Sequence, residues 1–204
     1  MAKLKAPLMS LGASGALGKA IVFFNWKGLD VVREYVVPAN PKTDPQNLQR
    51  GYMIACVTLI HAVQSVPVDP FDAGDVMAYS LLGSLEATPR TWFNTIVRQW
   101  LKQKVAGKIP AIYRNMSAVG GSEKLTVTGR VEAESSALES GKLYYGTSKS
   151  ALVNSIDCTK DHLGTGKDIP NLTAGVKYYV QFRALLPDTM IGSNSGILYG
   201  TPTA

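Results

Sequence analysis

Residues 176–185 read Val-Lys-Tyr-Tyr-Val-Gln-Phe-Arg-Ala-Leu, and this stretch decides the fold of the C-terminal part of the chain. Large apolar residues occupy every second position in it. A period of two is typical of a β-strand with one buried and one exposed face. We therefore predict a strand whose inner face carries Tyr178, Val180, Phe182 and Ala184, and whose outer face carries Tyr179, Gln181 and Arg183.

Similar short stretches lie on both sides of this strand. Turn residues such as Gly, Ser and Asn separate them, at the spacing of an antiparallel sandwich. The predicted strands cover residues 111–113, 124–131, 142–147, 152–157, 176–185 and 196–200. Because the periodicity changes from helical to alternating after Pro110, we place a boundary near residues 108–118. The predicted domains are residues 1–110 and residues 111–204.

Three helical patterns precede this boundary. Thr43 can cap the first helix, Gln46 can complete a capping box, and Pro45 suits the first turn. We expect that helix to end near Gln64, where two prolines follow. A second helix is predicted over residues 73–86, and a third begins at residues 88–91 and runs to about residue 105, before Gly107 and Pro110.

Two β-rich runs, residues 20–24 and 29–37, come before the helices, with residues 25–28 as a linker. This pattern predicts a β-hairpin. A lone two-stranded hairpin is marginally stable in water, so we expect it to pack on the rest of the domain or on another chain. Burying an aromatic side chain contributes about 1.5–3 kcal/mol. We predict that residues 6–37 form an assembly contact, with Phe23, Phe24, Trp26 and Tyr35 as its aromatic residues.

The net charge of +6 belongs to the first part of the chain. Met1 to Ser117 holds 13 basic and 7 acidic residues, whereas Ala118 to Ala204 holds 8 of each. Such a basic part can contact nucleic acid or an acidic protein, or its lysines can simply be solvated. No Lys/Arg run and no interleaving of Arg with aromatic residues favours nucleic acid. We expect no nucleic-acid partner and favour a protein partner for the basic residues around the third helix, which are Arg98, Lys102, Lys104 and Lys108.

The composition offers little material for catalysis or cofactor binding. Two cysteines and two histidines are too few for a disulfide framework or a tetrahedral zinc site. No unbroken run of about 18 apolar residues exists, so we expect no membrane span. The basic start of the chain only faintly resembles a secretory signal, because Ser10, Gly12 and neighbouring residues interrupt the apolar stretch.

Three motifs resemble functional sites, but each lacks a feature that its site would need. Residues 12–19 resemble a phosphate-binding loop but are one residue too long and precede a strand instead of a helix. No serine stands beside either histidine, as a catalytic triad would need. The group Asp157, Cys158, Asp161 and His162 lacks a second His or Cys, and we interpret it as a solvated loop. We expect no enzymatic activity, no metal and no cofactor.

Residues 172–184 resemble the corner and the following strand of a fibronectin type III domain. In that family a Leu precedes a Tyr by six residues, as Leu172 precedes Tyr178 here. The resemblance implies an all-β sandwich of the immunoglobulin type in which the Tyr178 hydroxyl bonds to upstream backbone. Residues 142–147 and 194–202 are similar to two further strands of the family. No Trp follows Trp100, so the resemblance implies Tyr144 or Tyr145 as a core aromatic residue.

The first 50 residues resemble small structural proteins of tailed bacteriophages and prophages. In these a hairpin is followed by a segment like residues 40–46, Asn-Pro-Lys-Thr-Asp-Pro-Gln, that leads into a helix. Fibronectin-like modules are also common on phage capsid and tail proteins. The resemblance implies a virion subunit of the neck, tail or capsid surface. Its partners would be copies of itself and other virion proteins, and its sandwich could contact a host surface.

The sequence also allows two other functions. One is an adhesion or carbohydrate-binding module of a cellular protein, which would need an export signal. The other is an enzyme. The fold class that we predict is α+β: an N-terminal β-hairpin and about three helices, followed by an all-β sandwich.

Overall fold

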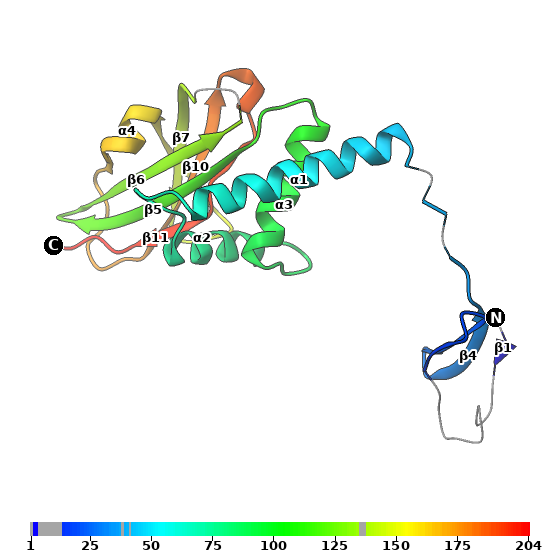
Figure 1. Ribbon diagram of the computed structural model, residues 1–204. Helices are drawn as coiled ribbons and strands as arrows, with labels where there is room; N and C mark the ends of the chain where they lie inside the picture. The colour runs from blue at the N-terminus through cyan, green and yellow to red at the C-terminus, as the bar shows by residue number, and fades with distance from the viewer. Residues whose placement is uncertain (1, 4–13, 38, 41, 135–137) are drawn as a thin grey trace. The chain divides into compact units, whose positions relative to one another are not determined.

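The computed structural model describes residues 2–3, 14–37, 39–40, 42–134 and 138–204 (Figure 1). Within these residues the protein is mixed α+β, with four α-helices and three antiparallel sheets. The chain divides into two compact units, Met1–Thr43 and Asp44–Ala204, which are called the N-terminal and the C-terminal unit below. Residues 6–13 of the expected assembly contact lie outside the described residues.

The N-terminal unit contains a four-stranded sheet in the order β1-β4-β3-β2. Its strands are β1 (Ala2–Lys3), β2 (Gly15–Leu17), β3 (Ile21–Trp26) and β4 (Leu29–Glu34). Strands β3 and β4 form the hairpin that the sequence predicted, paired from Ile21 with Glu34 to Trp26 with Leu29.

The hairpin turn is shorter than the sequence suggested. It consists of Lys27 and Gly28, and both have a positive φ, 51° and 77°. Such a pair is the type I′ geometry that suits the twist of two-residue hairpins. The Gly28 N–H also donates to the Asn25 Oδ1, at 3.0 Å. Asn25 and Trp26 therefore belong to strand β3 and not to a four-residue linker.

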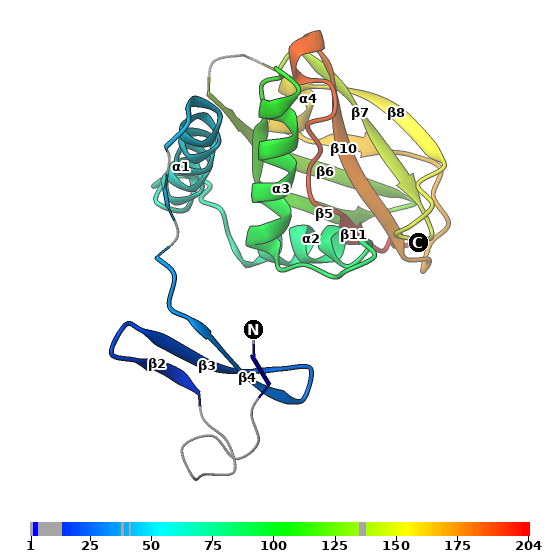
Figure 2. The ribbon, with the colours of Figure 1, turned by 90° about the vertical axis from the view of Figure 1, so that its right-hand side faces the viewer.

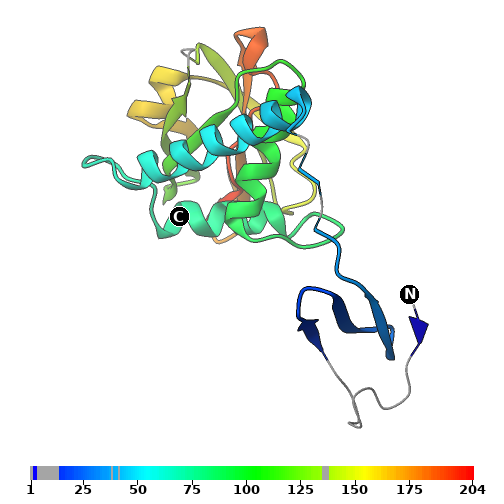
Figure 3. The ribbon, with the colours of Figure 1, turned by 45° about the vertical axis from the view of Figure 1, so that its right-hand side comes forward.

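The three predicted helices are confirmed at nearly the expected bounds. They are α1 (Asp44–Gln64), α2 (Ala73–Gly83) and α3 (Trp92–Val105), with α1 packed across α3 (Figure 3). The Thr91 hydroxyl caps α3 by accepting from the Asn94 N–H, and Gly107, with φ 72°, follows its end. The helices enclose a hydrophobic cluster of Cys56, Ile60, Val63, Phe71, Tyr79, Ile96, Val97, Trp100 and Ile112.

Two further sheets lie in the C-terminal unit (Figure 2). One has the order β5-β6-β9, formed by β5 (Ala111–Gly121), β6 (Lys124–Ala133) and β9 (Lys167–Ile169). The other has the order β11-β10-β7-β8, formed by β11 (Leu198–Gly200), β10 (Tyr178–Leu186), β7 (Ser140–Gly146) and β8 (Asn154–Thr159).

Both sheets contribute side chains to one hydrophobic core. Tyr113 of β5 and Phe182 of β10 are fully buried, with ring centroids 5.4 Å apart. Val180 and Ala184 are buried beside Phe182, and Tyr178 packs against the same core, as the alternation in residues 176–185 predicted. Gln181 differs from the prediction, because it is buried and its Nε2 donates to the Ser195 carbonyl oxygen at 3.0 Å.

All six predicted strands are present, but β5 is longer. In the C-terminal unit the prediction missed β9, the short helix α4 (Lys160–Thr165) and the 3-10 helix η2 (Asp188–Met190), and in the N-terminal unit it missed β1 and β2. The solvated-loop interpretation of residues 157–162 is wrong, since Cys158 is buried at the end of β8 and His162 lies in α4. A capping box starts that helix: the His162 N–H donates to the Thr159 hydroxyl, and the Thr159 N–H donates to His162 Nδ1.

Helix α2 binds directly to the sheets of the C-terminal unit. The Tyr113 N–H donates to the buried Tyr79 hydroxyl at 3.1 Å, and the Ile197 N–H donates to the Ala78 carbonyl oxygen at 3.0 Å. A Cβ at Gly196 would lie 2.6 Å from the Ala78 carbonyl carbon, so the close approach requires glycine. These bonds tie the helices to the strands, and the chain divides at Thr43 instead of near residue 110.

The corner before β10 brings Leu172 and Tyr178 close to the backbone that precedes the strand. Leu172 is buried, and its N–H donates to the Glu123 carbonyl oxygen at 2.9 Å. The Tyr178 hydroxyl oxygen accepts a hydrogen bond from the Thr173 N–H at 3.2 Å. The side chain thereby links strand β10 to the loop that leads into it.

Replacing Tyr178 by phenylalanine is expected to lower the free energy of unfolding by about 1 kcal/mol. The change removes one hydrogen bond at a site that is partly open to solvent, where water can take over part of the role. Urea denaturation followed by tryptophan fluorescence measures the loss. Tyr145→Phe, which removes a hydroxyl from another side chain on the edge of the core, is the matched control. Equal midpoints for the two variants would contradict the role of the bond.

Candidate assembly surface

The register of the N-terminal sheet gathers most of its aromatic side chains on one face. Cross-strand partners share a face, and the pairs here are Trp26 with Leu29, Phe24 with Val31, and Val22 with Arg33. The Arg33 guanidinium lies 5.4 Å from the centroid of the Phe24 ring, which agrees with this assignment. We call this the aromatic face and define it by Val22, Phe24, Trp26, Leu29, Val31, Arg33 and Tyr35.

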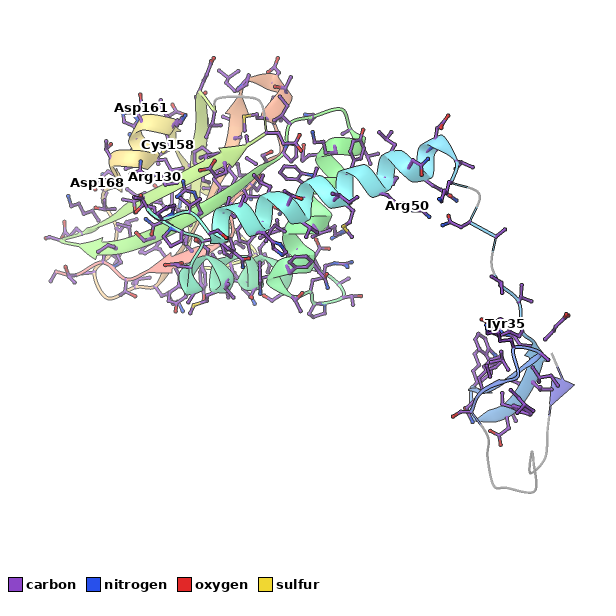
Figure 4. The ribbon with its side chains drawn as sticks, viewed as in Figure 1. Tyr35, Arg50, Arg130, Cys158, Asp161 and Asp168 are labelled. Carbon is purple, nitrogen blue, oxygen red and sulfur yellow. The ribbon has the colours of Figure 1, made fainter. Side chains whose placement is uncertain are left out.

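Tyr35 joins the aromatic face by continuing the ladder beyond β4 (Figure 4). Its N–H donates to the Ala20 carbonyl oxygen at 2.8 Å, so the alternation of β4 extends to this residue. Phe24, Trp26 and Tyr35 therefore share one surface. Phe23, which the sequence grouped with them, is the neighbour of Phe24 in β3 and points to the other side of the sheet.

The opposite face of the N-terminal sheet has an apolar end and a polar end. Phe23 is paired with Val32, and Leu17 with Ile21, so four apolar side chains meet at one end. Asn25 and Asp30 form the other end, where the Asn25 amide donates to the Asp30 carboxylate at 3.5 Å. The two faces thus differ in chemistry, and the aromatic face is the more apolar of the two.

Part of this apolar surface stays exposed: Phe24 and Tyr35 are half-buried, whereas the end of the aromatic face at the hairpin turn is open. Among the described side chains of the N-terminal unit, Val31 alone is buried, whereas Trp26 is 55% exposed and Leu29 is 46% exposed. Ordering the backbone costs about 1–2 kcal/mol per residue, and burial of apolar area has to offset that cost. Within the described residues of this unit, one fully buried side chain offsets only a small part of that cost.

The titratable groups that could support catalysis are few. Among the described residues, no three His, Cys, Asp or Glu side chains are grouped as metal ligands. His61 is exposed on α1, and its carbonyl oxygen accepts from the Ser65 hydroxyl at 2.9 Å. Both cysteines are free and buried.

Burial raises the pKa of the Cys56 thiol to about 12 and that of the Cys158 thiol to about 11. We expect both thiols to resist alkylation by iodoacetamide near pH 8 in the folded protein and to react after unfolding, because the thiolate is the reactive form. Mass spectrometry of the alkylated protein counts the modified residues. Rapid labelling of the folded chain would contradict the buried positions.

The same shifts predict a pH dependence of stability. When folding raises the pKa of a thiol, the contribution of that thiol to stability is fully present below the pKa of the unfolded thiol. This contribution is lost as pH rises through the pKa of the folded thiol. We therefore expect the free energy of unfolding to fall above about pH 9. Cys56→Ala is expected to weaken this dependence, which urea titrations at several pH values would show.

Comparison of the chain with models of known protein families found no match, and comparison with curated proteins found none either. Among the described residues, no helix combines the length and the apolar character that a membrane crossing requires.

Proposed function

We propose that the protein is a structural subunit of a tailed-bacteriophage particle that assembles through its N-terminal sheet. The aromatic face is the observation that carries the proposal, because its Trp26 and Leu29 stay exposed in the described part of their own unit and need a covering surface. Packing of this face on a neighbouring subunit would bury Phe24, Trp26 and Tyr35. Strand edges of the sheet could add main-chain hydrogen bonds to a neighbour.

The fold of the C-terminal unit supports a fibronectin type III-like sandwich within this proposal. Numbered in chain order, β5 to β11 are seven strands; the first, second and fifth form one sheet, and the other four form the second. In the constant type of immunoglobulin sandwich the fourth strand lies in the first sheet, whereas here it joins the second; the core shared by the two sheets agrees with that fold. The bond from the Thr173 N–H to the Tyr178 hydroxyl fits the tyrosine corner.

The proposed mechanism is assembly without catalysis. Partners are other copies of the chain and other virion proteins, and the protein would reside in the virion after synthesis in the host. The neck, the tail and the capsid surface are the positions that this function allows. Nucleic acid and membrane have no role in the proposal.

A surface on the sheet β11-β10-β7-β8 of the C-terminal unit favours host-surface contact as a second candidate function. Tyr179 and Tyr199 lie side by side on β10 and β11, with ring centroids 6.4 Å apart. The Lys177 ammonium lies 3.7 Å from the Tyr199 ring centroid and 5.4 Å from that of Tyr179. Tyr199 is exposed and Tyr179 is partly exposed, and such side chains combine apolar area with a polar tip, which suits recognition of a carbohydrate or another protein surface.

The proposal is tested on particles from a strain that carries this gene. Particles are induced, purified on a density gradient and digested for mass spectrometry. We expect peptides of this chain to sediment with the particles, and antibody labelling in the electron microscope to mark one structure on them. Recovery of the chain from the soluble fraction alone, in a preparation rich in particles, would contradict a virion role.

A further inference from the structure

A polar pocket lies between α3 and the loop before β11 in the C-terminal unit. It has a volume of about 170 Å³, and all its lining residues belong to the C-terminal unit. The Gln103 Nε2 closes one side by donating to the Gly192 carbonyl oxygen at 2.9 Å. Its other lining residues are Glu86, Arg90, Thr95, Arg98, Gln99, Lys102 and Asn194.

The positive charge of this pocket comes from a stretch of sequence that lacks acidic residues. Residues 87–122 contain six basic residues and no acidic residue. Four of the six have partners in the C-terminal unit: Arg98 pairs with Glu86, Lys104 with Glu134 and Arg114 with Glu132, while the Lys108 Nζ donates to the Ile191 carbonyl oxygen. The remaining two are Arg90 and Lys102.

Arg90 and Lys102 both line the pocket and are both exposed. Neither forms an ion pair or a side-chain hydrogen bond with any residue that the structure describes. Three cationic side chains thus meet one carboxylate there, that of Glu86. The surplus positive charge is concentrated in a concave site and not spread along a helix, which favours a ligand with a localised negative charge.

We propose that this pocket binds an acidic side chain on a segment of a partner protein. Arg90 and Lys102 would hold the carboxylate of the partner, and Arg98 would exchange part of its pairing with Glu86 for that ligand. The amides of Gln99 and Asn194 add donors and acceptors that match peptide groups. This inference concerns the C-terminal unit and does not depend on the virion assignment.

Two observations favour a peptide over a phosphodiester backbone. The Glu86 carboxylate inside the pocket would repel a run of phosphates, but a single side chain can avoid it. No aromatic ring lines the pocket for base stacking.

The test uses the full chain and a fluorescein-labelled peptide that carries one glutamate among glycine and serine residues, with anisotropy as the readout at low salt. We expect Arg90→Glu and Lys102→Glu each to weaken binding at least tenfold. Glu86→Gln is expected to tighten it about threefold or more, because it removes the internal competitor for Arg98. A gain of affinity cannot result from partial unfolding, so this variant separates ligand binding from a structural role.

Lys160→Glu is the matched control, since it makes the same change in charge on α4, outside this pocket. We expect it to change the affinity less than twofold. A duplex of 12 random base pairs is the competing probe. No peptide binding, equal losses for Lys160→Glu and Lys102→Glu, or an unchanged affinity in Glu86→Gln would overturn the proposal. Tighter binding of the duplex, lost in the Arg90 and Lys102 variants, would overturn it in favour of nucleic acid.

Discussion

Replacing Asp75 by asparagine is expected to lower the free energy of unfolding of the C-terminal unit by about 3 kcal/mol. Asp75 lies in the first turn of α2 with only 1% of its surface exposed. Its Oδ2 accepts from the N–H groups of Asn115 and Asp72, at 2.7 and 3.1 Å, and its Oδ1 accepts from the Met116 N–H at 2.9 Å. Both oxygens are therefore needed as acceptors.

An asparagine side chain would place an NH₂ group against at least one of these N–H donors. The register of β5 against β6 shifts between Arg114 and Ser117, and Asn115 there has a positive φ of 47°. Asp75 supplies the acceptors that this bulge lacks in its own ladder. Burial raises the pKa of Asp75, and the bonds from Met116, Asp72 and Asn115 act in the opposite direction.

Asp72→Asn is the matched control for this prediction. Asp72 caps the same helix by accepting from the Asp75 N–H, and asparagine is an equally good residue at that position. We expect a change within about 0.5 kcal/mol for the control. Urea denaturation of both variants, followed by tryptophan fluorescence, makes the comparison. Similar midpoints for the two would show that the bulge does not depend on the Asp75 carboxylate.

Replacing Trp26 by glutamate is expected to weaken self-association of the full chain by about tenfold to a hundredfold. Trp26 lies on the aromatic face beside Leu29, and full burial of such a side chain contributes about 1.5–3 kcal/mol. A carboxylate in the same place would also have to lose its hydration when the face is covered. Light scattering after size-exclusion chromatography, over a range of concentrations, measures the association.

Val153→Glu is the control for the Trp26 variant. Val153 is 81% exposed and lies in the C-terminal unit just before β8, so it introduces the same charge outside the N-terminal sheet. We expect its association to match that of the unmodified chain. If Val153→Glu dissociates the protein as strongly as Trp26→Glu, the effect comes from net charge and the aromatic face is not the contact.

Sequence periodicity predicted most of the regular elements. The apolar spacing of residues 44–64 and 92–105 has a period near 3.6, and the alternation in residues 176–185 has a period of two, so each pattern fixes its element. Strand β5 was predicted only to residue 113, because its bulge interrupts the alternation and depends on Asp75, some 40 residues away. Helix α4 is too short for a periodic pattern, and its start depends on the Thr159 and His162 capping box.

The candidate assembly surface was predicted only in part for a similar reason. A hairpin sequence identifies the aromatic residues but does not fix which of them share a face, because a shift of one residue in the register reverses every side chain. The two-residue turn at Lys27 and Gly28 sets that register. It places Phe24 and Trp26 together and turns Phe23 away. The polar pocket depends on residues from α3 and from the loop at Gly192, which no local pattern brings together.

Sedimentation velocity of the full chain and of residues 44–204 tests the central claim most directly. The shorter chain keeps both hydrophobic clusters of the C-terminal unit, so it is expected to fold. At the same micromolar concentrations, we predict an oligomer for the full chain and a monomer for residues 44–204. A monomeric full chain, or equal association of the two proteins, would contradict assembly through the N-terminal sheet.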